Sequence, residues 1–219
     1  MSPRRPSPER PGAQEWLPRG RAASDVDALA RAARDCHGCE LWADATQVVF
    51  SRGPEGARLV LVGEQPGDRE DREGEPFVGP AGRVLDDALD AAGLSVDDVY
   101  LTNAVKHFRF EERGTRRLHK SPDVAHVRAC LPWLTAEVAA VAPRVVVAMG
   151  ATAGRAVLGR PVRVTAERGR VLDLDDAPRV VLTTHPSALL RLRERAERES
   201  AFAALVDDLR LASDAAGVR

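Results

Sequence analysis

Four short apolar runs constrain the fold of this chain more than any other feature. They occupy residues 58–63, 99–105, 144–150 and 179–184. Segments with apolar side chains at helical spacing alternate with them, at residues 80–93, 121–141, 151–158 and 199–212, and a further helix is expected at 25–34. Short continuous apolar runs are typical of strands buried on both faces, and strands alternating with helices form mainly parallel sheets. We therefore predict an α/β fold with helices covering both faces of such a sheet.

The boundaries of these elements follow from local signals. Ser24 is the expected N-cap of the first helix, and Ser121-Pro122 is the expected start of the long helix that runs to about Val141. Residues 162–174 alternate only weakly, and we expect an irregular hairpin there.

Length and composition indicate one ordinary globular domain. The chain has 219 residues, of which 44% are hydrophobic and 30% charged. We expect a mobile N-terminal tail at residues 1–23 and one domain at 24–215. The N-terminus is rich in Pro, Arg and Ser without the apolar core of a secretory signal, and no apolar run reaches the length of a membrane span. We expect a monomer without a membrane partner in the bacterial cytosol or nucleoid.

The polar residues that follow the four runs predict one shared site. These residues are Glu64 and Gln65 after the first run, Asn103 to His107 at the second, Gly150 to Thr152 after the third, and His185 to Ser187 after the fourth. In parallel α/β sheets, ligands bind at the carboxyl ends of the strands. We therefore expect these residues to meet at one edge of the sheet.

The three cysteines favour a metal or cluster site over disulfides. Cys36 and Cys39 form a C-x2-C pair, and Cys130 lies in the long helical pattern. Three thiolates leave a four-ligand site one ligand short, which His107, His37 or His126 could supply. The spacing does not distinguish zinc from an iron–sulfur cluster, and free thiols or a buried apolar Cys130 are the simpler alternatives.

A basic segment carries the most reactive candidate side chain. Residues 106–120 hold six Lys or Arg against two acids, although the net charge of the whole chain is −1. Within it, Arg116-Arg117-Leu118-His119-Lys120 places a His among cations that bind phosphate. A neutral imidazole can attack an electrophile. This predicts either chemistry on a nucleic acid or simply a basic loop.

Several further residues suit recognition of a planar ligand. The Gly63–Asp68 turn presents backbone N–H groups and a carboxylate, Asn103 offers an amide donor and acceptor, and Phe77 could stack on a ring. His185 could donate to a ligand oxygen, and Leu189 and Leu190 beside Arg191 could form a wedge that enters a base stack. Each also has a structural alternative, as a turn or as core packing.

Together these motifs resemble the uracil-DNA glycosylase superfamily, within it the iron–sulfur family-4 branch, and most closely the UdgX subfamily. The matching stretches are GEQPGD at 63–68, PFVGPAG at 76–82, NAVKHF at 103–108, RRLHK at 116–120 and HPS at 185–187, together with the three cysteines. The resemblance spans about residues 25–213. It implies a three-layer α/β/α sandwich with a central four-stranded parallel sheet, and a [4Fe-4S] cluster held by Cys36, Cys39, His107 and Cys130. The usual family-4 pattern has a Cys where this chain has His107.

The resemblance also implies a reaction, the excision of uracil from DNA after the nucleotide is extruded from the duplex. Single-stranded DNA is expected to be accepted. Phe77 would stack on uracil, Asn103 would read its amide edge, and Glu70 would crowd the position of a thymine methyl group. Gln65, Gly67 and Asp68 would line the pocket, and His185 would donate to uracil O2. Contacts to DNA are implied for Arg116, Arg117, Lys120, Ser187, Leu189, Leu190 and Arg191, and Arg117 would also help to hold its loop.

At the level of the subfamily, the resemblance implies that His119 attacks C1′ of the sugar and stays attached, with Glu64 orienting the attack. The subfamily pattern usually reads Lys-Arg-Arg-Ile-His, whereas this chain has Thr115 and Leu118 in place of the Lys and Ile. Two alternatives remain. One is a multiple-turnover glycosylase in which His119 is a spectator, and the other is a DNA-damage binding module without catalysis.

Overall fold

The computed structural model describes residues 10–175 and 177–218. Within them, six strands form one sheet in the order β1-β3-β2-β6-β8-β7. Its strands are β1 (Ser51–Arg52), β2 (Leu59–Gly63), β3 (Tyr100–Asn103), β6 (Val145–Met149), β7 (Val171–Leu172) and β8 (Arg179–Thr183). The four central strands run parallel, whereas the short edge strands β1 and β7 are antiparallel to their neighbours. The predicted four-stranded parallel sheet is confirmed, with two edge strands added.

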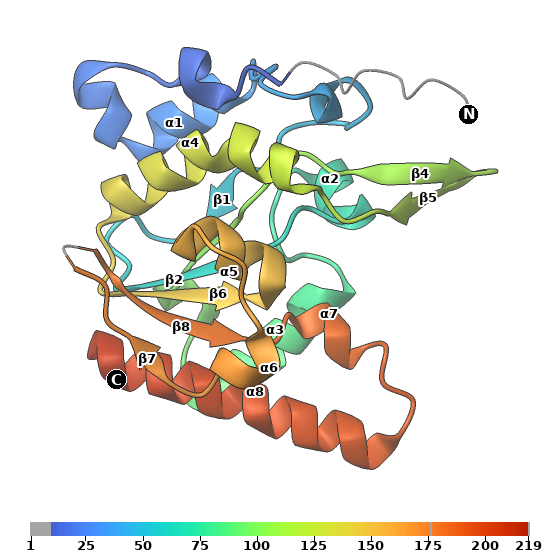
Figure 1. The fold of residues 1–219 in the computed structure, drawn as a ribbon, viewed down its shortest axis with the longest axis vertical. Helices are drawn as coiled ribbons and strands as arrows, with labels where there is room; N and C mark the ends of the chain where they lie inside the picture. Colours follow the sequence, from blue (N-terminus) through green and yellow to red (C-terminus); the bar gives the residue numbers. More distant parts are fainter. Residues whose placement is uncertain (1–9, 176, 219) are drawn as a thin grey trace.

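Helices cover both faces of the sheet and form a three-layer α/β/α sandwich (Figure 1). The helices are α1 (Val26–Ala33), α2 (Asp68–Glu73), α3 (Pro80–Ala92), α4 (Val124–Val141), α5 (Gly150–Leu158), α6 (Val164–Glu167), α7 (Pro186–Leu189) and α8 (Arg195–Ala216), with 3-10 turns at Ala13–Trp16, Gly20–Ser24, Glu40–Ala43 and Val96–Asp98. One apolar cluster joins α1, α4 and α5 to one face, and a second joins α3 and α8 to the other. The sequence-predicted fold class is therefore confirmed. No helix in the described ranges is both long and apolar enough to cross a membrane.

Two helix starts differ from the predictions. Asp25, not Ser24, caps α1, because its side chain accepts the N–H of Ala28 at 2.8 Å. Asp123, not Ser121, caps α4, because its carboxylate accepts the N–H groups of Ala125 and His126. In both cases a carboxylate stands closer to the first helical turn than the expected serine, and aspartate is an equally good N-cap.

The segment before α1 packs on the body of the protein. Ala13 is fully buried, Trp16 and Leu17 pack on the core, and Gly12 N donates to Gly38 O at 3.0 Å. Gly38 permits this approach, since a Cβ there would lie 2.7 Å from Gly12 C. Residues 10–23 thus differ from the mobile tail expected for 1–23, while residues 1–9 lie outside the described part of the chain.

The segment that carries His119 forms a two-stranded antiparallel ribbon, β4 (Phe110–Arg113) and β5 (Arg116–His119), which projects from the body (Figure 1). Gly114 turns the chain with a φ of +60°, as two-residue hairpin loops require. Neither strand has a buried face, so the alternation that reveals half-buried strands is missing. Residues 162–174 also differ from the expected hairpin, because they form α6 and then β7, which pairs with β8.

Candidate active site

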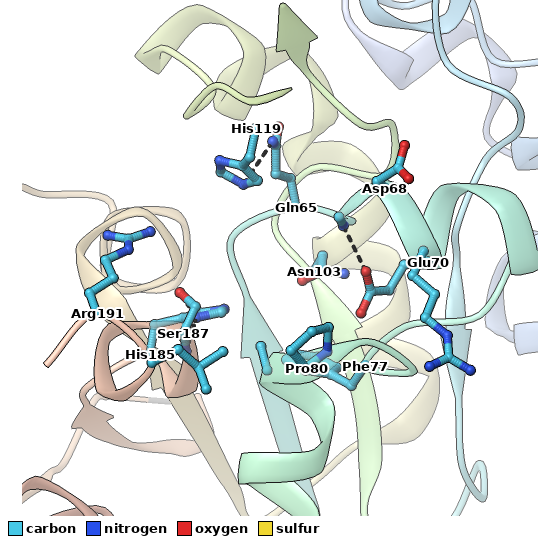
Figure 2. A pocket seen from close by; sticks show the side chains of 14 residues that line it. Gln65, Asp68, Glu70, Phe77, Pro80, Asn103, His119, His185, Ser187 and Arg191 are labelled. Carbon is cyan, nitrogen blue, oxygen red and sulfur yellow. Dashed lines mark hydrogen bonds between the residues drawn. The ribbon is translucent and has the colours of Figure 1, made fainter. Parts of the chain in front are cut away.

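The carboxyl ends of β2, β3 and β8 meet at one pocket, as the strand-end residues predict, whereas Gly150 to Thr152 after β6 do not line it. The pocket has a volume of about 380 Å³, enough for a small planar ligand. Eleven of its lining residues were predicted, namely Gln65, Gly67, Asp68, Glu70, Phe77, Asn103, His119, His185, Ser187, Leu190 and Arg191. Arg69, Pro80 and Ala81 line it as well. In Figure 2, Phe77 lies on the opposite side of the pocket from His119.

Local backbone geometry shapes the pocket floor, which we define as Phe77, Asn103 and His185. Phe77 and Asn103 are buried, and Phe77 adopts a φ of +60°, a strained value for a residue with a bulky side chain. Gly63 makes room for both, since a Cβ there would lie 2.3 Å from Asn103 Oδ1 and 2.7 Å from the Phe77 ring. Gly82 is required beneath Phe77, because a Cβ there would lie 1.8 Å from its carbonyl oxygen.

Glu70 braces the pocket wall. Its carboxylate accepts the N–H of Gly79 at 2.8 Å. It also accepts the N–H of Gly67 at 3.1 Å (Figure 2). A Cβ on either glycine would lie within 2.8 Å of that carboxylate. The side chain therefore fixes the two loops that enclose the pocket, in addition to lining it.

His119 lies at the end of β5, with its ring about two-fifths exposed. Its Nε2 is 3.0 Å from Gln65 Nε2 and 3.8 Å from Glu64 Oε1. Gln65 Oε1 accepts the backbone N–H of Arg109, which turns the amide nitrogen towards His119, and an amide nitrogen can only donate. Its two hydrogens are shared among the imidazole and the carbonyls of Arg109 and Lys120. Nε2 of His119 is therefore the unprotonated nitrogen. Partial burial lowers the pKa of His119, although Glu64 opposes the shift, and the neutral ring is favoured.

Glu64 is held by Thr152, a residue that the sequence reasoning placed at a strand end without giving it a role. Thr152 Oγ1 donates to Glu64 Oε2 at 2.7 Å and leaves Oε1 directed at His119. The position of Thr152 directly after the third apolar run is the sequence signal that indicates a role in the site.

His185 presents one defined nitrogen to the pocket. Its Nδ1 accepts the backbone N–H of Ser187 at 3.2 Å, so the neutral ring carries its proton on Nε2. Burial lowers the pKa of His185 to about 4, so the ring is neutral at pH 7. The arrangement leaves an N–H donor available to a ligand oxygen.

A second cavity, on the α4 side of the sheet, brings the four predicted cluster ligands together. Cys36, Cys39, His107 and Cys130 line it with Gly38, Lys106, Ala129 and Trp133. The cysteines are free and buried, and His107 is also buried. Of the competing histidines, His37 is exposed and stacks on Trp42, and His126 bonds to Glu40. No three His, Cys, Asp or Glu side chains among the described residues are arranged to hold a single metal ion.

The electrostatics of this cavity suit a cationic cofactor. Burial raises the pKa of Cys39 to about 11 and that of Cys130 to about 12, and it lowers the pKa of His107 to about 4. A positively charged iron or zinc centre would offset the free-energy cost of burying deprotonated thiols. It would also bind the free lone pair of a neutral imidazole. The donor set therefore fits a metal cluster.

Comparison with known proteins identifies the family. A model described as the uracil DNA glycosylase superfamily matches residues 50–210. The chain belongs to this superfamily. It is 37% identical over 169 residues to a type-4 uracil-DNA glycosylase of Thermotoga maritima, covering 77% of this chain and 84% of the relative. A type-4 uracil-DNA glycosylase of Archaeoglobus fulgidus is 32% identical over 185 residues, covering 81% and 89%. A type-5 uracil-DNA glycosylase of Pyrobaculum aerophilum is 34% identical over 167 residues, covering 68% and 70%.

Arg117 and Leu189, which were predicted to contact DNA, both point into the protein. Arg117 turns inward, where Nε contacts Asp68 Oδ1 at 2.5 Å and Nη1 contacts Asp71 Oδ2 at 2.6 Å, above the rings of Phe108 and Phe110. These two ion pairs agree with the expected role of Arg117 in holding the loop, and they direct its guanidinium at carboxylates of the protein. Leu189, the last residue of α7, is buried in the core, whereas Leu190 is exposed. The predicted wedge is therefore a single leucine.

The remaining predicted contacts are divided between the pocket and the hairpin. Ser187 and the exposed Arg191 line the pocket, and Ser187 Oγ lies 2.9 Å from His185 Nδ1. Arg116 and Lys120 are exposed, at the turn of the hairpin and at the end of β5. Asp71 was missed by the sequence reasoning, because it stands in a run of charged residues typical of a solvated helix. It is fully buried, and its carboxylate accepts the N–H of Thr46.

Proposed function

We propose that this protein excises uracil from DNA and captures the resulting sugar on His119, as the resemblance to the UdgX subfamily implies. The observation that carries the proposal is the unprotonated Nε2 of His119, held between Gln65 and Glu64 at the entrance of a pocket that would accept a planar base.

The pocket supplies the groups that base release needs. Uracil would stack on Phe77 while Asn103 contacts its amide edge and Glu70 narrows the far wall. The C1′–N1 bond breaks and its electron pair leaves with the base, and the N–H of His185 would donate to uracil O2 as negative charge develops there. The sugar becomes an oxocarbenium ion, whose positive charge Glu64 would stabilise.

Capture then forms one bond and releases one proton. The lone pair on Nε2 of His119 attacks C1′, which gives an imidazolium that loses its Nδ1 proton, and the departing uracil anion takes up one proton. The net change replaces the bond from C1′ to uracil with a bond from C1′ to the imidazole. No water is consumed.

The experiment is incubation with a single-stranded oligonucleotide that contains one uracil, followed by a denaturing gel and a measurement of free uracil. We expect a shifted band that survives denaturation, and no band with the thymine-containing oligonucleotide. His119→Ser should abolish the band and retain some uracil release. A band that persists in this variant would show that another residue is the nucleophile.

A conventional multiple-turnover glycosylase is the second candidate, favoured by the similarity to type-4 uracil-DNA glycosylases. In that enzyme, water would attack C1′ in place of His119. Uracil release in excess of the enzyme, without a shifted band, would establish this alternative.

We also propose that Cys36, Cys39, His107 and Cys130 hold a [4Fe-4S] cluster. When bound, the cluster would join the loop at 36–39, helix α4 and the segment after β3, which is a structural role. A brown protein whose visible absorption bleaches on reduction supports this proposal. A colourless protein with stoichiometric zinc would contradict it.

A further inference from the structure

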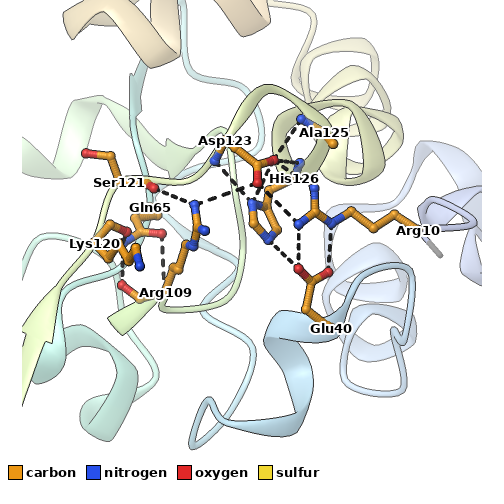
Figure 3. Close-up of polar contacts among 9 residues, drawn as sticks. All are labelled: Arg10, Glu40, Gln65, Arg109, Lys120, Ser121, Asp123, Ala125 and His126. Carbon is orange, nitrogen blue, oxygen red and sulfur yellow. Dashed lines mark hydrogen bonds and ion pairs between the residues drawn. The ribbon is translucent and has the colours of Figure 1, made fainter. Parts of the chain in front are cut away.

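A network of charged side chains connects the loop that carries Cys39 to the base of the β4–β5 hairpin (Figure 3). Glu40 follows Cys39 directly, and its Oε1 lies 2.9 Å from Nε2 of His126, whose side chain is fully buried. Nδ1 of His126 accepts the backbone N–H of Asp123 at 3.1 Å, so Nε2 carries the proton that is donated to Glu40. One end of the network is thus fixed beside the predicted cluster ligands, since Cys130 lies one turn further along α4.

Arg10 closes this end of the network. Its Nε donates to Glu40 Oε2 at 2.8 Å and its Nη1 donates to Asp123 Oδ1 at 2.8 Å. The arginine is largely buried and binds both carboxylates at once, a geometry that holds planar groups in a defined orientation. Asp123 is therefore held in place both by the start of α4 and by Arg10, which is itself bonded to Glu40.

Arg109 connects Asp123 and the start of α4 to the hairpin. Its Nη1 donates to the carbonyl of Ser121 at 2.8 Å and lies 3.8 Å from Asp123 Oδ2. Its backbone closes the hairpin, because Lys120 N donates to Arg109 O at 3.0 Å. The next residue pair along the ribbon is Phe110 and His119. The side chain of Arg109 is therefore anchored one residue pair away from His119, whose ring also contacts Gln65 Nε2.

We infer that Arg109 is a positioning residue that determines whether C1′ is captured by His119 or by water. The inference rests on the proposed capture. In both outcomes the C1′–N1 bond breaks and its electrons leave with uracil. The new bond comes either from Nε2 of His119 or from a water oxygen, and the attacking group gives up one proton. A hairpin released from Asp123 and Ser121 would leave the pocket floor intact but move the imidazole away from C1′, and a displacement of about 1 Å can cost on the order of 100-fold in rate.

The test measures the fraction of uracil-release events that end in the denaturation-stable band, for the wild type and for Arg109→Met. The matched control is Arg113→Met, which removes the same charge from the same hairpin. Arg113 is exposed, and its contact with Glu111 is at the 4.0 Å limit of an ion pair. We expect the captured fraction to fall at least about tenfold in Arg109→Met, with total uracil release within about twofold of the wild type. Arg113→Met should match the wild type.

Arg109→Lys provides the rescue, because its ammonium can still donate to the Ser121 carbonyl, and it should recover part of the captured fraction. An equal captured fraction in Arg109→Met and Arg113→Met would overturn the role of Arg109 while leaving capture intact. A parallel loss of release and capture would also overturn it, since that pattern indicates general misfolding, which the visible absorption of the cluster would report. A wild type that releases uracil without any band would refute the proposed capture and this inference with it.

Discussion

The pocket floor and the β4–β5 hairpin differ in how many contacts fix them. Asn103 is buried at the end of β3 and Phe77 in the loop before α3, and side chains at Gly63 or Gly82 would collide with this floor. The hairpin pairs only with itself, and Leu118 next to His119 is 39% exposed. Its polar links to the body include the side chains of Gln65, Arg109 and Arg117, and its Phe110 ring stacks on the buried Phe108. Base release and sugar capture are therefore assigned to regions of different rigidity, and substitutions should separate them.

The largest expected effect comes from a floor residue. Asn103→Asp keeps the shape of the side chain but removes its N–H donor and adds a negative charge facing the uracil carbonyl. We expect the rate constants of uracil release and of capture to fall together, by about 10²- to 10³-fold, as for the loss of a catalytic hydrogen-bond donor. Single-turnover kinetics on the gel and on free uracil would check this. A selective loss of capture would show that the floor and the hairpin are not separable.

The second prediction compares adjacent arginines of the hairpin. Arg117→Met leaves the fully buried Asp71 without its cation, which should cost roughly 3–5 kcal/mol, or about 10 °C in Tm. Arg116→Met removes an exposed charge and should change Tm by less than about 2 °C, while it weakens DNA binding in a salt-dependent way. Circular dichroism and binding titrations at two salt concentrations measure both. Equal shifts in Tm would mean that Arg117 does not anchor the hairpin.

The same contrast explains what could be predicted from the sequence. The central strands and the convergence of Glu64, Asn103 and His185 follow from apolar runs with polar residues at their ends, because parallel strands align those ends. The hairpin was not predicted, since Arg116 to His119 has no buried face and so no periodicity. The inward turn of Arg117 and the burial of Asp71 depend on a pairing between distant segments, which no local pattern of charges indicates.

The third prediction concerns pH and stability. His185 binds a proton with a pKa of about 4 in the folded protein, against about 6.5 in the unfolded chain. The unfolded state binds more protons between these values, so this group makes the fold less stable as the pH falls from 6.5 towards 4, by roughly 2 kcal/mol between pH 6.5 and 4.5. Tm measured across this range should fall less steeply for His185→Gln than for the wild type.

The hairpin histidine supplies the contrast. The ring of His119 is more exposed, so His119→Gln should alter the slope of Tm against pH less than His185→Gln does. Glu64, Arg191 and the two imidazoles influence one another, and both variants should therefore be measured in the same buffers. A larger change for His119→Gln would mean that the hairpin encloses this residue more tightly than the floor encloses His185.

The smallest expected effect tests the cluster cavity, whose four candidate ligands are buried like Phe77 and Asn103 of the pocket floor. The indole N–H of the fully buried Trp133 donates to Cys36 Sγ at 3.2 Å. If Cys36 ligates the proposed cluster, this donor would stabilise the more negative, reduced state, so Trp133→Phe should make the reduction potential more negative. One such hydrogen bond is worth at most about 1.5 kcal/mol, which corresponds to about 60 mV for one electron.

Phe50→Leu is the control, because Phe50 packs edge-on against Trp133 and contributes no side-chain donor to the thiols. Spectroelectrochemical titration should show the shift in Trp133→Phe alone, and an equal shift in both variants would attribute it to packing and not to the hydrogen bond.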